Sequence, residues 1–198
     1  MPTTQDYFLS LTSALPDTEY SIHINVTPVG QVIGNVEYVD PDHNIALSWT
    51  DYFLAYETSF SDDLLFPNGE IIFKLAFIGS DFYEGTNLRR SEIFISLTDE
   101  PDRVTDCLLP IHREPRLADR IINGVSFVHY VLHGVFTGNI VEQHSFRTVH
   151  GDACYEIAYL IRYTNIGNYP SLTVEEFDHE GLVQMLEAVI DTFQLLPE

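Results

Sequence analysis

Basic side chains are scarce in this sequence. Its 198 residues include 30 Asp and Glu but only 9 Lys and Arg, which gives a net charge of −21 at pH 7. Lys74 is the single lysine. An acidic surface repels DNA, RNA and anionic lipids. We therefore expect no direct nucleic-acid binding, whereas a basic protein partner, cations or a purely solubilising charge stay open.

Long apolar runs are also missing. No stretch approaches the roughly 18 consecutive apolar residues that a membrane-spanning helix needs, so we expect no membrane insertion of this chain. The segment from Met1 to Leu15 contains apolar residues, but it lacks the basic start and the long apolar centre of a signal peptide.

Motifs of common enzyme classes are absent as well. The sequence contains no Gly-x-Ser-x-Gly nucleophile motif. Residues 30–34 begin and end with glycine, but they match neither a phosphate-binding loop nor a dinucleotide-binding loop. Adjacent acids such as Asp62 and Asp63 are weak evidence for a carboxylate site, because acids are abundant throughout. We therefore assign no catalytic residue and no cofactor.

Alternating apolar and polar residues dominate what is present. Tyr20, Ile22, Ile24 and Val26 follow a period of two, which is typical of a strand with one buried face. Similar patterns predict strands over residues 31–39, 44–49, 52–58, 70–78, 91–98, 124–135, a return strand ending at His150, and 154–163. Residues 99–118 contain three prolines and are expected to form a loop.

The C-terminal segment changes to the period of a helix. Leu182, Leu186 and Phe193, with Val189 or Ile190, form an apolar stripe, and Asp178 is a good N-cap. A helix is thus predicted near residues 178–194, packed on the sheet. The predicted fold class is α+β: one domain, with a lead-in segment over 1–19 and a core of antiparallel sheet flanked by helices over 20–198.

Histidines are the natural place to look for a site. His129 and His133 share one face of a predicted strand, and His144 lies on the strand expected to pair with it. With Glu142 nearby, a divalent-metal cluster is conceivable. The spacing is not diagnostic in a strand, so ordinary surface or core histidines are the favoured interpretation and no metal is assigned.

Two groups of basic residues stand out against the acidic background. Arg89 and Arg90 form one, and residues 112–116 form the other. Because acids are everywhere nearby, we expect ion pairing within the protein rather than anion binding.

Cys107 and Cys154 are widely separated and fit no zinc motif. From the sequence they are either two buried thiols or one disulfide.

The C-terminal half carries a set of short motifs in a characteristic order. They comprise residues 83–88 (YEGTNL), 122–127 (INGVSF), 138–139 (GN), 147–148 (RT), 154–157 (CYEI), 164–170 (TNIGNYP) and 176–178 (EFD). In these, residues 82–196 resemble small uncharacterised bacterial secreted or lipoprotein-type domains of the PsbP/Mog1-like superfamily. The resemblance implies an α/β/α sandwich with the last helix across the sheet. It also implies that Cys107 and Cys154 are paired in an oxidising compartment, and it supplies no activity.

Two main functions follow from these observations. The first is a non-catalytic accessory or binding domain, periplasmic, lipoprotein-type or secreted, with an unknown protein partner. The alternative is an acidic cytoplasmic interaction protein, which could mimic nucleic acid on a basic protein surface. A hydrolytic enzyme is a third, weaker hypothesis, which a pocket with converging His and carboxylate groups would favour.

Overall fold

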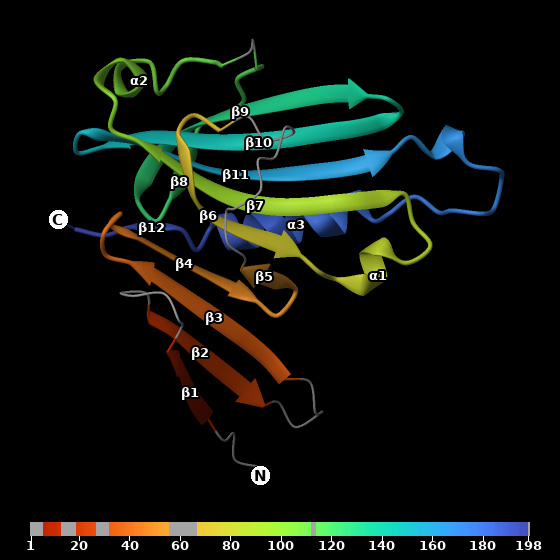
Figure 1. Ribbon diagram of the computed structural model, residues 1–198, viewed down its shortest axis with the longest axis horizontal. Coiled ribbons are helices and arrows are strands. Elements are labelled where there is room, and N and C mark those ends of the chain that lie inside the picture. The colour runs from red at the N-terminus through yellow and green to blue at the C-terminus, as the bar shows by residue number, and fades with distance from the viewer. Residues whose placement is uncertain (1–5, 13–18, 27–31, 56–66, 112–113, 198) are drawn as a thin grey trace.

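The computed structural model describes residues 6–12, 19–26, 32–55, 67–111 and 114–197 (Figure 1). Antiparallel strands make up most of it, and they form two sheets. Sheet A has the order β1 (Asp6–Thr12), β2 (Glu19–Val26), β3 (Val32–Asp40), β4 (Ile45–Thr50) and β12 (Gln194–Leu195). Sheet B has the order β5 (Phe53–Ala55), β6 (Glu70–Phe77), β7 (Leu88–Thr98), β11 (Ala153–Thr164), β10 (Asn139–His150), β9 (Val125–Phe136) and β8 (Arg120–Ile122).

Three α-helices lie in the described part of the chain. They are α1 (Ser80–Tyr83), α2 (Pro101–Thr105) and α3 (His179–Ile190), and a short 3₁₀ helix spans Ile166–Asn168. None of them is long and apolar enough to cross a membrane. The predicted α+β class with antiparallel strands is therefore confirmed.

The structure corrects the sequence predictions at three places. The expected lead-in segment contains β1, which pairs antiparallel with β2. The expected loop over 99–118 contains α2, because Pro101 stands in its first turn, where a missing N–H costs no bond. Strands predicted as one sheet divide into two, since the chain leaves sheet A after Thr50 and enters sheet B at Phe53. Residues 56–58, predicted as strand, lie outside the described residues.

The three consecutive strands predicted near the C-terminus are confirmed. β9, β10 and β11 pair in register as neighbours, with Phe146 of β10 opposite His129 of β9 and Ile157 of β11. Because side chains alternate along a strand, this register places His129, His144 and Glu142 on one face of sheet B. The opposite face carries a small apolar cluster of Phe94, Val141, Ala158 and Leu160.

Helix α3 begins as predicted. The Asp178 side chain accepts a hydrogen bond from the Gly181 amide at 2.9 Å, which caps the first turn. Its apolar stripe, Leu182, Leu186, Val189 and Ile190, is buried in the main core. In Figure 1, α3 lies behind β7 and β6, so it covers one face of sheet B.

The helix ends at Ile190, earlier than predicted, because the following residues turn towards sheet A. Phe193 is still buried, at 1% exposure, although it lies beyond the helix. Gln194 and Leu195 then pair with Ala46 and Ile45 of β4. The C-terminal segment thereby connects the two sheets.

Truncation of the α3 stripe should destabilise the whole fold. Leu186 is fully buried, and Leu186→Ala removes packing on both the helix and sheet B. We expect the free energy of unfolding to fall by about 2.5–4 kcal/mol in chemical denaturation followed by circular dichroism. Gln184→Ala, on the exposed side of the same helix, is the control and should change stability by less than about 0.5 kcal/mol.

Candidate functional site

Histidines of sheet B form a hydrogen-bonded chain with one carboxylate. Nε2 of His129 lies 2.9 Å from Nδ1 of His144, and Nε2 of His144 lies 3.0 Å from Oε1 of Glu142. The other carboxylate oxygen, Oε2, lies 3.2 Å from Nε2 of His179, the first residue of α3. This hydrogen-bonded chain of side chains thus runs from β9 across β10 to α3.

The carboxylate determines which nitrogens carry protons. An ionised Glu142 only accepts, so His144 donates from Nε2 and, when neutral, accepts at Nδ1. His129 must then donate from Nε2, which leaves its Nδ1 as the unprotonated end of the chain. A further proton entering this chain can therefore be taken up at His129.

Burial makes that uptake unfavourable. Burial, followed by the charges of the nearby His144 and Arg120, lowers the pKa of His129 to about 4. Burial also opposes ionisation of Glu142, but the hydrogen bonds and charges of His144 and His179 outweigh it, so the Glu142 pKa lies below its usual value. At neutral pH the chain holds a neutral His129 and an ionised carboxylate.

Aromatic rings hold two of these histidines in place. The His129 ring stacks on Phe146 with centroids 4.2 Å apart, and the His144 ring stacks on Tyr159 at 4.6 Å. The Tyr159 side chain is fully buried, and its hydroxyl hydrogen-bonds to none of the described residues. Burial, followed by the charges of Glu187 and Glu142, raises the pKa of Tyr159, so the phenol stays protonated.

The weak metal candidates from the sequence are thus brought onto one face, but not as a metal centre. His129 and His144 bond to each other, while His133 is mostly exposed and its Nδ1 lies 4.0 Å from Glu142. Among the residues that the structure describes, no group of three or more His, Cys, Asp or Glu side chains is arranged to hold a metal ion. His179, which the sequence prediction missed, reaches Glu142 from another element.

A separate cavity lies between β4, the start of β5 and α3. Its volume is about 290 Å³, and its apolar lining comes mainly from Trp49, Phe53, Met185, Ala188 and Val189. Residues on the rim are open to solvent, including Tyr52 at 45% exposure. None of the described residues that line it is His, Cys, Asp or Glu. This composition is typical of a site that binds an apolar group.

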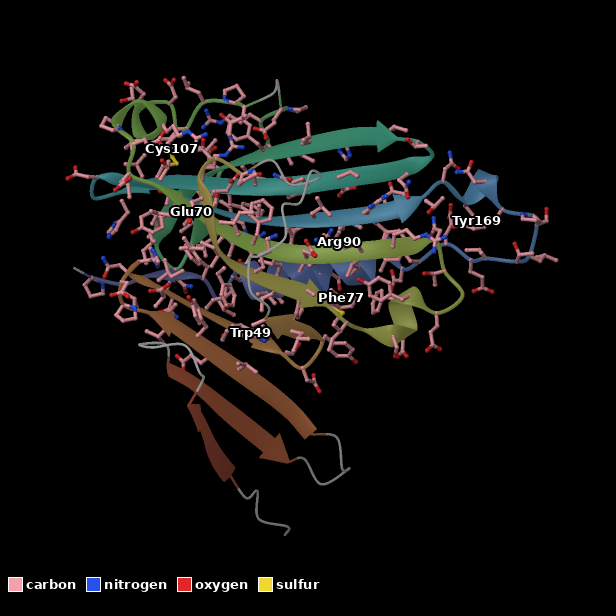
Figure 2. The ribbon with its side chains drawn as sticks, viewed as in Figure 1. Trp49, Glu70, Phe77, Arg90, Cys107 and Tyr169 are labelled. Carbon is pink, nitrogen blue, oxygen red and sulfur yellow. A yellow bond between two sulfur atoms is a disulfide. The ribbon has the colours of Figure 1, made fainter. Side chains whose placement is uncertain are left out.

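The aromatic side chains beneath this cavity are held by the core. The Trp49 ring lies 5.5 Å from the Phe73 ring, which in turn stacks on Tyr38 at 4.2 Å. Figure 2 labels Trp49 on β4 and Phe77 on β6. Trp49 is only 4% exposed and is the single tryptophan of the chain. Its fluorescence therefore reports on this region alone.

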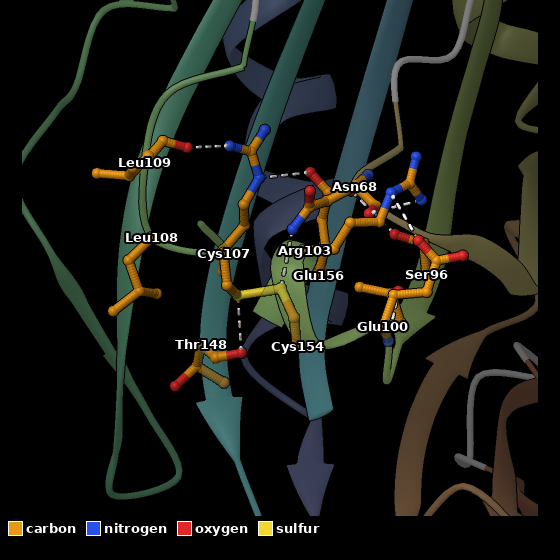
Figure 3. The surroundings of a disulfide bond; sticks show 12 residues. Asn68, Ser96, Glu100, Arg103, Cys107, Leu108, Leu109, Thr148, Cys154 and Glu156 are labelled. Atoms are coloured by element: carbon orange, nitrogen blue, oxygen red, sulfur yellow. Dashed lines mark hydrogen bonds and ion pairs between the residues drawn. A yellow bond between two sulfur atoms is a disulfide. The ribbon is translucent and has the colours of Figure 1, made fainter. Parts of the chain in front are cut away.

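The two cysteines belong to neither of these groups of residues. Cys107 and Cys154 form a disulfide that attaches the loop after α2 to β11, as Figure 3 shows. Both residues are buried, and the Asn68 side-chain amide lies 2.9 Å from the Cys154 sulfur. The pairing that the family resemblance implies is present, and its environment is that of a structural bond rather than a reactive thiol.

A buried ion cluster holds the same loop beside the disulfide. The fully buried Arg147 guanidinium donates to both carboxylate oxygens of Glu114, at 2.9 and 3.0 Å, and to Glu156 at 3.0 Å. Glu156 also accepts from the Ser96 hydroxyl at 2.9 Å and from the Asn68 backbone N–H at 2.7 Å. Removal of one partner from such a cluster leaves an uncompensated buried charge, so the cluster serves the fold.

Ion pairing is observed for two of the basic residues that stood out in the sequence, whereas Arg89 donates to the Thr164 hydroxyl at 2.9 Å. Arg90 pairs with Glu92, and Arg116 pairs with Asp119. Residues 112 and 113 lie outside the described part of the chain.

No family model matches the sequence, and no curated protein matches it. The fold is similar to a crystal structure from Bacteroides thetaiotaomicron, with a TM-score of 0.46 and 11% sequence identity. That similarity covers 82% of this chain but 48% of the other, so this chain spans about half the length of that protein.

The buried histidine chain should make stability depend on pH. The His129 pKa is about 4 in the folded protein and 6.5 ordinarily, so the unfolded chain takes up this proton first as the pH falls. Folding therefore loses stability between about pH 7 and pH 4, by about 1–2 kcal/mol after allowance for solvent screening. Loss of the Glu142 charge at still lower pH acts in the same direction.

His129→Gln, which retains a donor towards His144, should reduce this pH dependence in denaturation experiments at several pH values. The matched control is His133→Gln, on the same strand and face but with a side chain that is 60% exposed. An equal loss of slope in both variants would contradict the assignment to His129.

Proposed function

We propose that this protein is a non-catalytic binding domain of an extracytoplasmic compartment, with the sandwich architecture of the PsbP/Mog1-like superfamily. The observation that carries the binding role is the open apolar cavity between β4, β5 and α3. A hydrolytic role would be favoured by His and carboxylate groups converging on a cavity, and the lining that the structure describes has neither. The histidine chain around Glu142 instead has its groups hydrogen-bonded to one another.

The cavity is suited to one apolar group of modest size. Its volume of about 290 Å³ lies at the lower end of the range for small-molecule sites. An aromatic ring or a short branched chain would displace water from Trp49, Phe53 and Met185. Such burial stabilises a complex through the hydrophobic effect, without any reaction.

The disulfide supports the proposed compartment. Disulfides persist in oxidising environments such as the periplasm and the cell exterior, and they are rare in the cytosol. The Cys107–Cys154 bond closes a sequence separation of 47 residues, for which chain entropy predicts about 4 kcal/mol of stabilisation. The acidic surface is compatible with this assignment and with a basic partner.

Binding in the cavity can be measured with a neutral apolar dye, N-phenyl-1-naphthylamine. We expect saturable one-to-one binding, seen as an increase in dye emission together with quenching of Trp49. Ala188→Phe fills the cavity from the helix and should weaken binding by at least about 10-fold. Gln184→Phe adds the same ring one turn earlier, outside the lining, and should leave binding unchanged. Undiminished dye binding to a folded Ala188→Phe protein would refute the cavity as the site.

The proposed extracytoplasmic location can be tested separately, through the state of the two cysteines. Protein purified without reductant should titrate with no free thiols after denaturation, because both cysteines are paired. The Cys107→Ala/Cys154→Ala double variant should lose about 3–4 kcal/mol of stability against denaturant. Two free thiols in the isolated wild-type protein would instead favour a cytoplasmic protein.

A further inference from the structure

The cavity lies at the edge of β4 rather than over one of its faces. Side chains alternate along a strand, so neighbours such as Trp49 and Thr50 point to opposite faces. Both nevertheless line the cavity, together with Ser48. A space lined by both faces of a strand lies beside its edge, where backbone N–H and C=O groups point outward.

That edge is covered only in part. β12 pairs with Ala46 and Ile45, and the Leu196 amide donates to Asn44 at 2.8 Å. Two residues further along β4, at Ser48, the Thr192 side chain makes the contacts that a paired strand residue would make. Its hydroxyl accepts from the Ser48 amide at 2.9 Å and lies 2.7 Å from the Ser48 carbonyl oxygen. The edge of β4 is therefore satisfied as far as Ser48.

Thr50 is the next residue of β4 with the same orientation. Asn44, Ala46 and Ser48 all direct their backbone groups to this edge, and the period of two places Thr50 with them. In the described part of the chain, no backbone group beyond Thr192 meets Thr50 on this side. The backbone N–H and C=O groups of Thr50 thus lie beside the apolar cavity, which Thr50 also lines.

We propose that this edge of β4 receives an extended, basic segment of a partner protein, which pairs with Thr50 and places an aromatic side chain in the cavity. Free strand edges bind extended peptides through main-chain hydrogen bonds, while adjacent pockets select the side chains. The negative charge of this protein determines which residues should flank the aromatic side chain in the partner. Asp51 is exposed directly after Thr50, and the chain carries −21 overall, so basic flanking residues are attracted and acidic ones repelled.

This inference rests on the proposed function, since it names the occupant of the same cavity. The test uses the blocked peptide Lys-Val-Phe-Val-Lys, followed by Trp49 emission and calorimetry with the full chain. Replacement of the phenylalanine by alanine, or of both lysines by glutamate, should weaken binding by at least about 10-fold. Affinity for the basic peptide should also fall as salt is raised from about 50 to 300 mM.

Strand pairing is tested separately by N-methylation of the peptide backbone, one residue at a time. Thr50 offers one N–H and one C=O at this edge, so methylation should abolish binding at the one peptide amide that faces Thr50 and be tolerated at the others. Equal tolerance at every position would refute pairing with the edge.

Two variants of β4 test the same contact from the protein side. Thr50→Pro removes the outward N–H, whereas Thr50→Val keeps it, so only the first should lose the peptide. Dye binding in both variants reports that the cavity is still formed. If the dye binds with the expected Ala188→Phe sensitivity but the peptide does not, the strand inference fails and the binding function stands. If neither binds, both fail.

Discussion

The packing of α3 against sheet B, with its C-terminal end hydrogen-bonded to sheet A, is the interaction on which the rest of the structure depends. The buried stripe around Leu186 fixes the helix over one face of sheet B. Thr192 and β12 then attach the same segment to β4. The cavity is lined by residues of β4, β5 and α3, so it depends on this packing. His179, the first residue of α3, completes the hydrogen-bonded chain around Glu142.

Much of the fold could be predicted because local patterns determine it. The strands β9, β10 and β11 and the start of α3 at Asp178 are encoded by alternation, turn residues and a capping side chain. The division into two sheets could not be predicted, because nothing local distinguishes β4, in sheet A, from β5, in sheet B. β12 is too short for any periodicity, and it exists through its pairing with β4.

The histidine chain could be predicted from the sequence only for the residues that lie on one pair of neighbouring strands. His129, His133 and His144 share a face by strand parity, which the sequence reveals. His179 joins them from a helix that begins 35 residues after His144, and no spacing rule connects those positions. The cavity depends on contact between β4 and the C-terminal segment of α3 and the residues after it. Ser48 and Thr192, which hydrogen-bond there, are 144 residues apart in the sequence. Its lining of ordinary core residues gives no signal until the fold is known.

The burial of the Cys107–Cys154 pair constrains the order in which the protein can be assembled. The two cysteines are 0% and 1% exposed, beside the Arg147 cluster that closes the same region. A thiol oxidant or isomerase cannot reach sulfurs in that position. Oxidation must therefore occur while the loop after α2 is still away from sheet B. Docking of Glu114 onto Arg147 then seals a bond that is already made, and the finished protein is protected from thiol exchange.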